Sequence, residues 1–168
     1  MYTRLLDGTE VLIRPILPSD KQMISDGIAC LSERSIQQRF LAPKKRFSAA
    51  ELRYLTEVDG RDHYAIVAQL ADDPSAIVGV ARFVRLREDA AAAEPAIVVC
   101  DDLQQRRLGT QLARMLGDAA RTRGISRFVA TVLSDNPAAM RLMRTLAVRL
   151  VEGEHDHGVQ SVSMDLAA

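Results

Sequence analysis

The sequence predicts an α/β fold with a central mixed, twisted sheet of about six to seven strands flanked by helices. Short β-rich runs alternate with segments whose apolar residues recur at helical spacing, which is typical of strands connected by helices. The chain has 168 residues, of which 48% are hydrophobic, and this is enough for one sizeable core. We therefore expect one domain that covers residues 1–168.

The N-terminal half predicts a strand, three helices and a hairpin. Residues 9–14 are β-rich and stop at Pro15, which cannot donate to a sheet ladder. Ser48, with Glu51 three residues later, forms a capping box that indicates where one helix begins. The other expected elements are helices from residues 18 and 32, strands over residues 64–70 and 77–87, and a turn at residues 72–75.

The clearest helix of the chain starts at Leu108. Apolar residues such as Leu108 and Leu112 recur on one face, and Gly124 supplies a C-terminal stop. Asn136 is expected to cap a second helix, because Pro137 suits the first helical turn. The remaining expectations are strands over residues 95–100, 128–133, 148–151 and 159–166, a loop at residues 89–93, and a polar link at residues 153–158.

Composition argues against several classes of function. Lys plus Arg and Asp plus Glu both number 22, so the zero net charge argues against a broad nucleic-acid footprint. No apolar run is long enough to cross a bilayer and the first residues lack a signal-peptide core, so we expect a cytoplasmic protein with no membrane partner. Two cysteines do not suggest a disulfide framework. His155 and His157 lie in a polar turn, so no metal site is expected.

The segment from Val98 to Thr110 changes from a strand, through a polar turn, to the start of a helix. A helix N-terminus exposes unpaired N–H groups and the positive end of the helix dipole, which suits a pyrophosphate. Gly109 permits the close approach of a ligand, and Arg106 and Arg107 add positive charge. The alternative is an ordinary helix start that faces water. A P-loop is excluded, because no GxxxxGK[ST] motif occurs.

The sequence VVCDDLQQRRLGTQLARML resembles the coenzyme A loop of the GNAT acetyltransferases, whose pattern is Arg/Gln-x-x-Gly-x-Gly/Ala. Gln104 matches the first position and Gly109 the last, while Arg107 stands where the middle glycine is usual. SDNPAAMRLM resembles a later helix of the family, with Asn-x-x-Ala at Asn136 and Ala139. The segments DGTEVLIRPILPSD, LSERSIQQRF and LTEVDGRDHYAIVA are similar to bacterial protein lysine acetyltransferases.

This resemblance implies a GNAT fold whose central strands splay apart to hold acetyl-CoA, with no metal. It implies that the pyrophosphate binds backbone N–H groups of the polar turn, and that the pantetheine pairs with the preceding strand as an extra strand would. The cofactor-binding residues that it implies are Val98, Val99, Cys100, Gln104, Gln105, Arg106, Arg107, Leu108, Gly109, Thr110 and Asn136.

The resemblance also implies a catalytic base. Glu94 lies just before the central strand, at a position similar to the glutamate used by protein lysine acetyltransferases. A free lysine has a pKa near 10.4, so a base must take its proton as the amine attacks the thioester. Such a base works better when it is shielded from water, so we expect Glu94 to be partly buried. The alternative is that Glu94 is a solvated surface charge.

Three departures from the family pattern bear on activity. Arg107 adds a side chain where a glycine is usual, and it is expected either to weaken the loop or to grip a phosphate. The tyrosine acid that follows the Asn-x-x-Ala helix in many members is missing, since Tyr2, Tyr54 and Tyr64 all lie upstream. The usual Leu-Gly-Phe end of that helix is replaced by residues 146–148, Leu-Ala-Val.

Together these features imply an acetyl-CoA-dependent N-acetyltransferase whose acceptor is a protein lysine. Two alternatives stay open: an acetyltransferase for a small amine, and a non-catalytic module that binds coenzyme A. Arg107 and the missing tyrosine motivate the second alternative. The sequence does not decide between a monomer and a homodimer.

Overall fold

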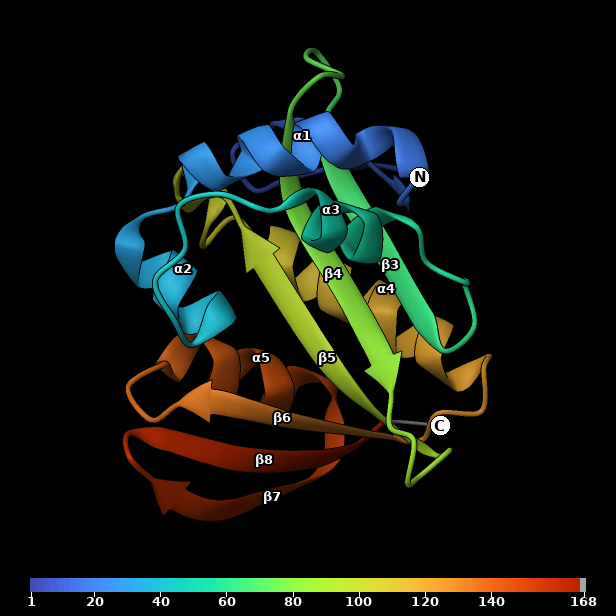
Figure 1. Cartoon of the computed structure of the whole chain (residues 1–168), viewed down its shortest axis with the longest axis vertical. Coiled ribbons are helices and arrows are strands. Elements are labelled where there is room, and N and C mark those ends of the chain that lie inside the picture. The colour runs from blue at the N-terminus through green and yellow to red at the C-terminus, as the bar shows by residue number, and fades with distance from the viewer. Residues whose placement is uncertain (167–168) are drawn as a thin grey trace.

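An eight-stranded mixed sheet forms the centre of the molecule (Figure 1). The computed structural model describes residues 1–166, and the strand order is β1-β2-β3-β4-β5-β6-β8-β7. Neighbours are antiparallel except for β5 and β6, which run parallel. The strands are β1 (Tyr2–Arg4), β2 (Glu10–Pro15), β3 (His63–Leu70), β4 (Ile77–Arg85), β5 (Ala92–Val99), β6 (Arg127–Leu133), β7 (Ala147–Asp156) and β8 (Val159–Leu166).

Helices cover both faces of this sheet, so the expected mixed α/β fold is confirmed. Figure 1 shows α1, α2 and α3 on the near face, and α4 and α5 on the far face. The helices are α1 (Lys21–Asp26), α2 (Glu33–Phe40), α3 (Ala49–Thr56), α4 (Leu108–Arg121) and α5 (Pro137–Leu146), with short 3-10 turns η1 (Pro18–Asp20), η2 (Gly27–Cys30) and η3 (Asp101–Leu103).

The helix starts follow the capping residues that the sequence offers. Ser48 Oγ accepts a hydrogen bond from the backbone N–H of Glu51, and the Glu51 carboxylate accepts one from the N–H of Ser48. Asn136 accepts from the N–H of Ala139 over 3.1 Å, and Pro137 occupies the first turn of α5. Each side chain satisfies an N–H that the helix itself leaves without a partner. Both predicted helix starts are confirmed.

The packing of α4 onto the sheet fixes the position of the candidate loop. Leu108, Leu112 and Leu116 are almost fully buried, as their helical spacing predicts. A Cβ atom at Gly79 on β4 would lie 3.0 Å from the Leu112 Cδ1 atom, so a larger residue there would force the Leu112 side chain or the helix to shift. The start of α4 is thereby held against the end of β5, because Val99 packs into the same core.

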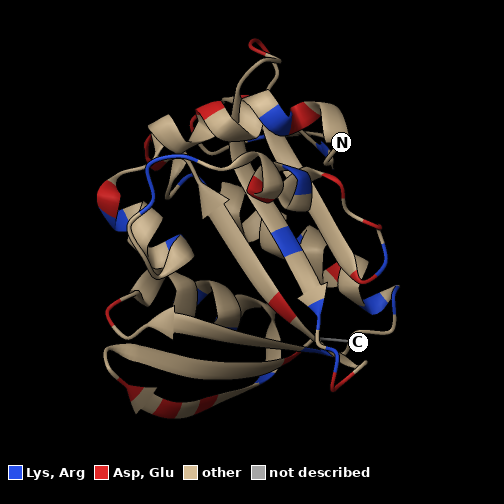
Figure 2. Ribbon diagram, viewed as in Figure 1, with Lys and Arg blue, Asp and Glu red and all other residues tan. Residues whose placement is uncertain are grey.

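Several boundaries differ from the expectation. The sheet contains one more strand than expected, β1. This strand has only three residues, which is too short for a recognisable pattern in the sequence. The expected loop at residues 89–93 is wrong in its second half, because Ala92 and Ala93 are fully buried in β5, where they pair with β4 or β6. Most of the expected link at residues 153–158 belongs to β7. That strand forms the sheet edge and carries a row of acidic residues (Figure 2), which discourages pairing with other strands.

The expectation about the cysteines is also wrong, because Cys30 and Cys100 form a disulfide. The bond closes a sequence separation of 70 residues and joins the end of η2 to the residue that follows β5. Two cysteines so far apart carry no pairing signal in the sequence, because only the fold brings their Cα atoms to 5.2 Å.

The parallel pair β5 and β6 separates after two residue pairs. Ala92 lies opposite Arg127 and Ala93 opposite Phe128, and no further pairing joins these strands. On its other side β5 stays paired with β4 as far as Val99. The edge of β5 that faces β6 is therefore open from Glu94 onward, which confirms the expected splay. Within residues 1–166, none of the helices combines the length and apolar character that a bilayer crossing requires.

Candidate active site

The opening between β5 and β6 leads into a cavity of about 710 Å³. This is the size range of ligand sites in proteins. The cavity is bounded by both strands, by the start of α4 and by one side of α5. Of the site residues that the sequence predicts, those that line it are Glu94, Val98, Val99, Gln104, Gln105, Arg107, Gly109, Thr110 and Asn136.

The loop before α4 holds two residues in the left-handed conformation that glycine adopts most easily, and neither of them is a glycine. Gln105 has φ of 60° and Arg107, the N-cap of α4, has φ of 70°. Residues other than glycine rarely adopt this left-handed backbone conformation, which costs them about 1–2 kcal/mol. The loop pattern in the sequence correctly indicates that Arg107 occupies a costly position. Gln105 occupies a second one. The first N–H groups of α4 have no partner within the helix and are available to an anion.

Gln104 holds this loop to its surroundings. Its side-chain nitrogen lies 3.1 Å from the carbonyl oxygen of Val99, 3.1 Å from a carboxylate oxygen of Asp101 and 3.2 Å from Ser35 Oγ. These contacts join the end of β5, the turn η3 and helix α2. The side chain of Gln104 therefore shapes the loop, and residues beyond it, from Gln105 to Thr110, contribute to the cavity lining.

Three of the expected cofactor residues direct their side chains elsewhere. Cys100 is bound in the disulfide, the Arg106 guanidinium pairs with Asp7, and Leu108 is 1% exposed in the core. Only their backbone groups remain for a cofactor. Asn136 lines the cavity, but its side-chain oxygen already caps α5 through Ala139.

Glu94 stands at the first position of β5 where pairing with β6 has ended. Its neighbour across the sheet is Val84 of β4, and the next pair on the same face is Ala96 with Arg82. Glu94 and Arg82 are therefore diagonal neighbours on the face that α1–α3 cover. Glu94 is exposed to solvent, so the partial burial expected of this side chain is not found.

Sequence reasoning missed two arginines beside Glu94. Arg82 is 5% exposed, and burial together with the nearby charge of Arg39 lowers the pKa of Arg82 to about 10. Burial also lowers the pKa of Arg39, while the charge of Glu94 acts in the opposite direction. Both groups remain cationic at neutral pH. The alternation of side chains along the strand could have predicted that Arg82 lies on an inner face. The sequence does not reveal that it lies near Arg39, because 43 residues separate the two.

Arg82 is held by neutral groups. Its Nη2 donates to the carbonyl oxygen of Leu55 over 2.9 Å, and its Nη1 lies 3.1 Å from Nε2 of His63. Burial, with the charge of Arg82, lowers the pKa of His63 to about 4, so this ring is uncharged at neutral pH. Nε of Arg82 is buried and has no partner among the described residues.

The sequence and the fold both match known proteins. Residues 32–147 match the family model described as the acetyltransferase (GNAT) family. Acetyltransferase Pat of Mycolicibacterium smegmatis is 36% identical over 160 residues, which are 95% of this chain and 46% of that protein. Acetyltransferase PA5475 of Pseudomonas aeruginosa is 34% identical over 145 residues, covering 86% of this chain and 75% of that protein.

A solved structure agrees with these matches. The GNAT domain of PAT from S. lividans superposes with a TM-score of 0.87 at 27% identity, covering 99% of this chain and 96% of that one. The chain spans about half the length of the Mycolicibacterium relative. The matched family model covers more than half of the chain, and the relatives named Pat fall in its bacterial protein acetyltransferase branch. This chain therefore belongs to the GNAT family of acetyltransferases.

Proposed function

We propose that this chain transfers an acetyl group from acetyl-CoA to the ε-amine of a protein lysine. The observation that carries the proposal is the cavity at the splay, which Glu94, the open edge of β5 and the start of α4 all line. Similarity to proteins named acetyltransferase Pat supports the choice of a protein acceptor.

The residues present fit acetyl-CoA. The N–H groups at the start of α4 suit the pyrophosphate, and the guanidinium of Arg107 can reach a phosphate from the same rim of the cavity. On the open edge of β5, the backbone groups of Ile97 and the N–H of Val99 suit the amides of the pantetheine, because they lack a β6 partner. The alternation of the ladder turns the N–H and carbonyl of Val98 toward β4 instead.

In the proposed reaction the lysine nitrogen attacks the thioester carbonyl carbon. The new C–N bond forms, the C–S bond breaks, and coenzyme A leaves as the thiol after protonation. Glu94 takes the proton that the attacking amine loses, directly or through one water. An N–H on the open edge of β5 donates to the oxyanion that develops on the carbonyl oxygen.

The first test is a thermal-shift titration with acetyl-CoA and coenzyme A, followed by transfer assays. A ligand that binds the folded state raises the melting temperature by mass action. We expect a shift with both compounds and acetyl transfer to lysine-containing peptides. Transfer to spermidine or free amino acids, but to no peptide, would assign a small amine instead. Binding without transfer to any amine would leave a coenzyme A-binding module.

A further inference from the structure

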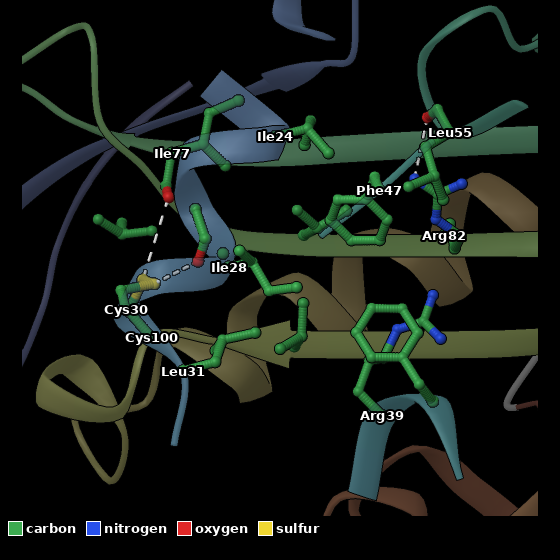
Figure 3. A pocket seen from close by; sticks show the side chains of 16 residues that line it. Ile24, Ile28, Cys30, Leu31, Arg39, Phe47, Leu55, Ile77, Arg82 and Cys100 are labelled. Atoms are coloured by element: carbon green, nitrogen blue, oxygen red, sulfur yellow. Dashed lines mark hydrogen bonds between the residues drawn. A yellow bond between two sulfur atoms is a disulfide. The ribbon is translucent and has the colours of Figure 1, made fainter. Parts of the chain in front are cut away.

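A second, smaller hollow lies on the near face of the sheet, between β4, β5 and the helices α1–α3. Its volume is about 60 Å³. Figure 3 shows it from close by, with Cys30 and Cys100 at one end and Arg39 and Arg82 at the other. Most of its wall is apolar, and the residues that supply this surface include Ile24, Ile28, Leu31, Phe47, Leu55 and Val80. We call this hollow the arginine pocket.

Neither guanidinium group of the arginine pocket forms a salt bridge with a described residue, although the nearby charge of Glu94 acts on Arg39. Within residues 1–166 every ion pair involves other side chains. Arg39 and Arg82 instead repel one another, and Arg82 keeps a buried Nε without a partner. The buried Arg82 and the half-buried Arg39 are neighbouring cations in an apolar wall, which is costly unless an anion joins them. Their planar forks suit a carboxylate.

The arginine pocket is a side branch of the active-site cavity. Arg39, Phe40 and Val98 line both hollows. The open edge of β5 at Ile97 and Val99, on either side of Val98, is where the proposed function places the pantetheine. A group attached to the reacting carbonyl carbon can therefore extend from the larger cavity toward Arg39.

We propose that the arginine pocket binds a carboxylate on a short apolar chain joined to one of the two reactants. This inference rests on the proposed acyl transfer. The volume of the pocket is about five times what one water needs, which is enough for two methylene groups and a carboxylate. That size favours the acyl group of a dicarboxylic acyl-CoA, such as succinyl-CoA. A carboxylate of the acceptor amine is the other source of the same chemistry.

With such a donor, the same bonds form and break as with acetyl-CoA. The amine attacks the thioester carbonyl, the C–N bond forms, the C–S bond breaks, and the amine proton passes to the base. The distal carboxylate is unchanged, because it serves only to hold the chain between Arg39 and Arg82.

The test measures dissociation constants by calorimetry for coenzyme A, succinyl-CoA and 4-methylpentanoyl-CoA. The last compound replaces the carboxylate by two methyl groups of similar shape. Arg39→Gln removes one charge of the pocket. Arg34→Gln is the matched control, because Arg34 is an exposed residue of the same helix that lines neither hollow. Arg82→Gln is a third variant, used only if its melting temperature shows that it folds.

We expect the wild type and Arg34→Gln to bind succinyl-CoA about tenfold or more tightly than the methyl analogue, as one charge-assisted contact allows. Arg39→Gln should lose that preference while its affinity for coenzyme A stays the same. Coenzyme A binding thus reports on the proposed cofactor site independently of the carboxylate. If coenzyme A does not bind, the proposed function and this inference fall together.

A second arm tests the acceptor as the source, with acetyl-CoA as donor and β-alanine or propylamine as acceptor. A preference for β-alanine that Arg39→Gln removes would support the carboxylate site and assign it to the acceptor. If coenzyme A binds but neither arm shows a preference, or if Arg39→Gln keeps the preference, the carboxylate site is overturned while the cofactor site stands.

Discussion

Arg82 and His63 are joined by a hydrogen bond of 3.1 Å between Nη1 and Nε2 on neighbouring strands. A guanidinium only donates, so Nε2 of His63 accepts and the ring is neutral, with its proton on Nδ1. Protonation of His63 would remove this acceptor and place a second cation against Arg82. The contact therefore makes the fold sensitive to acid.

We expect His63 to destabilise the protein as pH falls from 6.5 toward 4. The unfolded ring takes its proton near pH 6.5, whereas the folded ring has a pKa of about 4. The unfolded state therefore binds more protons than the folded state within this window. The contribution of His63 to the free energy of unfolding is complete above pH 6.5 and is lost as the pH falls toward 4. After a discount for solvent screening, we expect a loss of about 1–2 kcal/mol.

Urea unfolding at pH 4.5, 5.5, 6.5 and 7.5 measures this slope. His63→Gln keeps an acceptor for Arg82 but does not titrate, so its stability should change less across the window. His155→Gln, in the exposed hairpin, is the control and should retain the wild-type slope. Equal slopes for wild type and His63→Gln would show that another group is responsible.

Glu94→Gln should lower the turnover number about a hundredfold at neutral pH, because removal of a general base typically costs at least this much. The affinity for acetyl-CoA should be unchanged. The rate should partly recover as pH rises, since more of the acceptor amine is then already deprotonated. Steady-state rates measured between pH 7 and 10 check both points. Glu88→Gln, an exposed change in the β4–β5 loop, is the control, and an unaltered rate in Glu94→Gln would remove this residue from the mechanism.

Arg107→Gly should raise the free energy of unfolding by about 1 kcal/mol, because glycine adopts the φ of 70° without steric cost. The gain is partly offset by the greater freedom of glycine in the unfolded chain. Urea unfolding without ligand measures the difference. Arg106→Gly is the neighbouring control: it loses the contact with Asp7, has no positive φ to relieve, and should be destabilised. A loss of stability in Arg107→Gly would mean that its side chain holds the loop.

Loss of the disulfide should lower stability by about 4 kcal/mol, since Cys30 and Cys100 close a long loop. The double variant Cys30→Ala, Cys100→Ala should melt well below the oxidised wild type. Reductant should lower the melting temperature of the wild type and leave the double variant unchanged. If reductant has no effect on the wild type, the two sulfurs are not bonded in solution.

Local patterns were enough to predict most of the secondary structure. The capping box at Ser48, the cap at Asn136 and the apolar spacing of α4 each depend on residues within a few positions, so the sequence displays them directly. The family pattern likewise indicated which part of the chain forms the loop before α4. That pattern also predicted a backbone cost at Arg107, because the replacement of a usual glycine is visible in the sequence itself.

The features that were missed depend on contacts between distant segments. Cys30 meets Cys100, and Arg39 meets Arg82, only after three helices fold onto β4 and β5. Neither the number of cysteines nor any local motif therefore predicts the disulfide or the two adjacent arginines. The sequence left open whether Glu94 is partly buried or solvated, and the folded chain decides for the solvated alternative.

The separation of β5 from β6 after Ala93 also gives this protein two strand edges in its interior. Unpaired strand edges are templates for association with other chains, and most proteins keep them short or covered. A cofactor that pairs with β5 would cover one of these edges, so ligand binding should slow amide hydrogen exchange along β5 as well as fill a cavity. Bound coenzyme A would then also keep this edge from pairing with a strand of another chain.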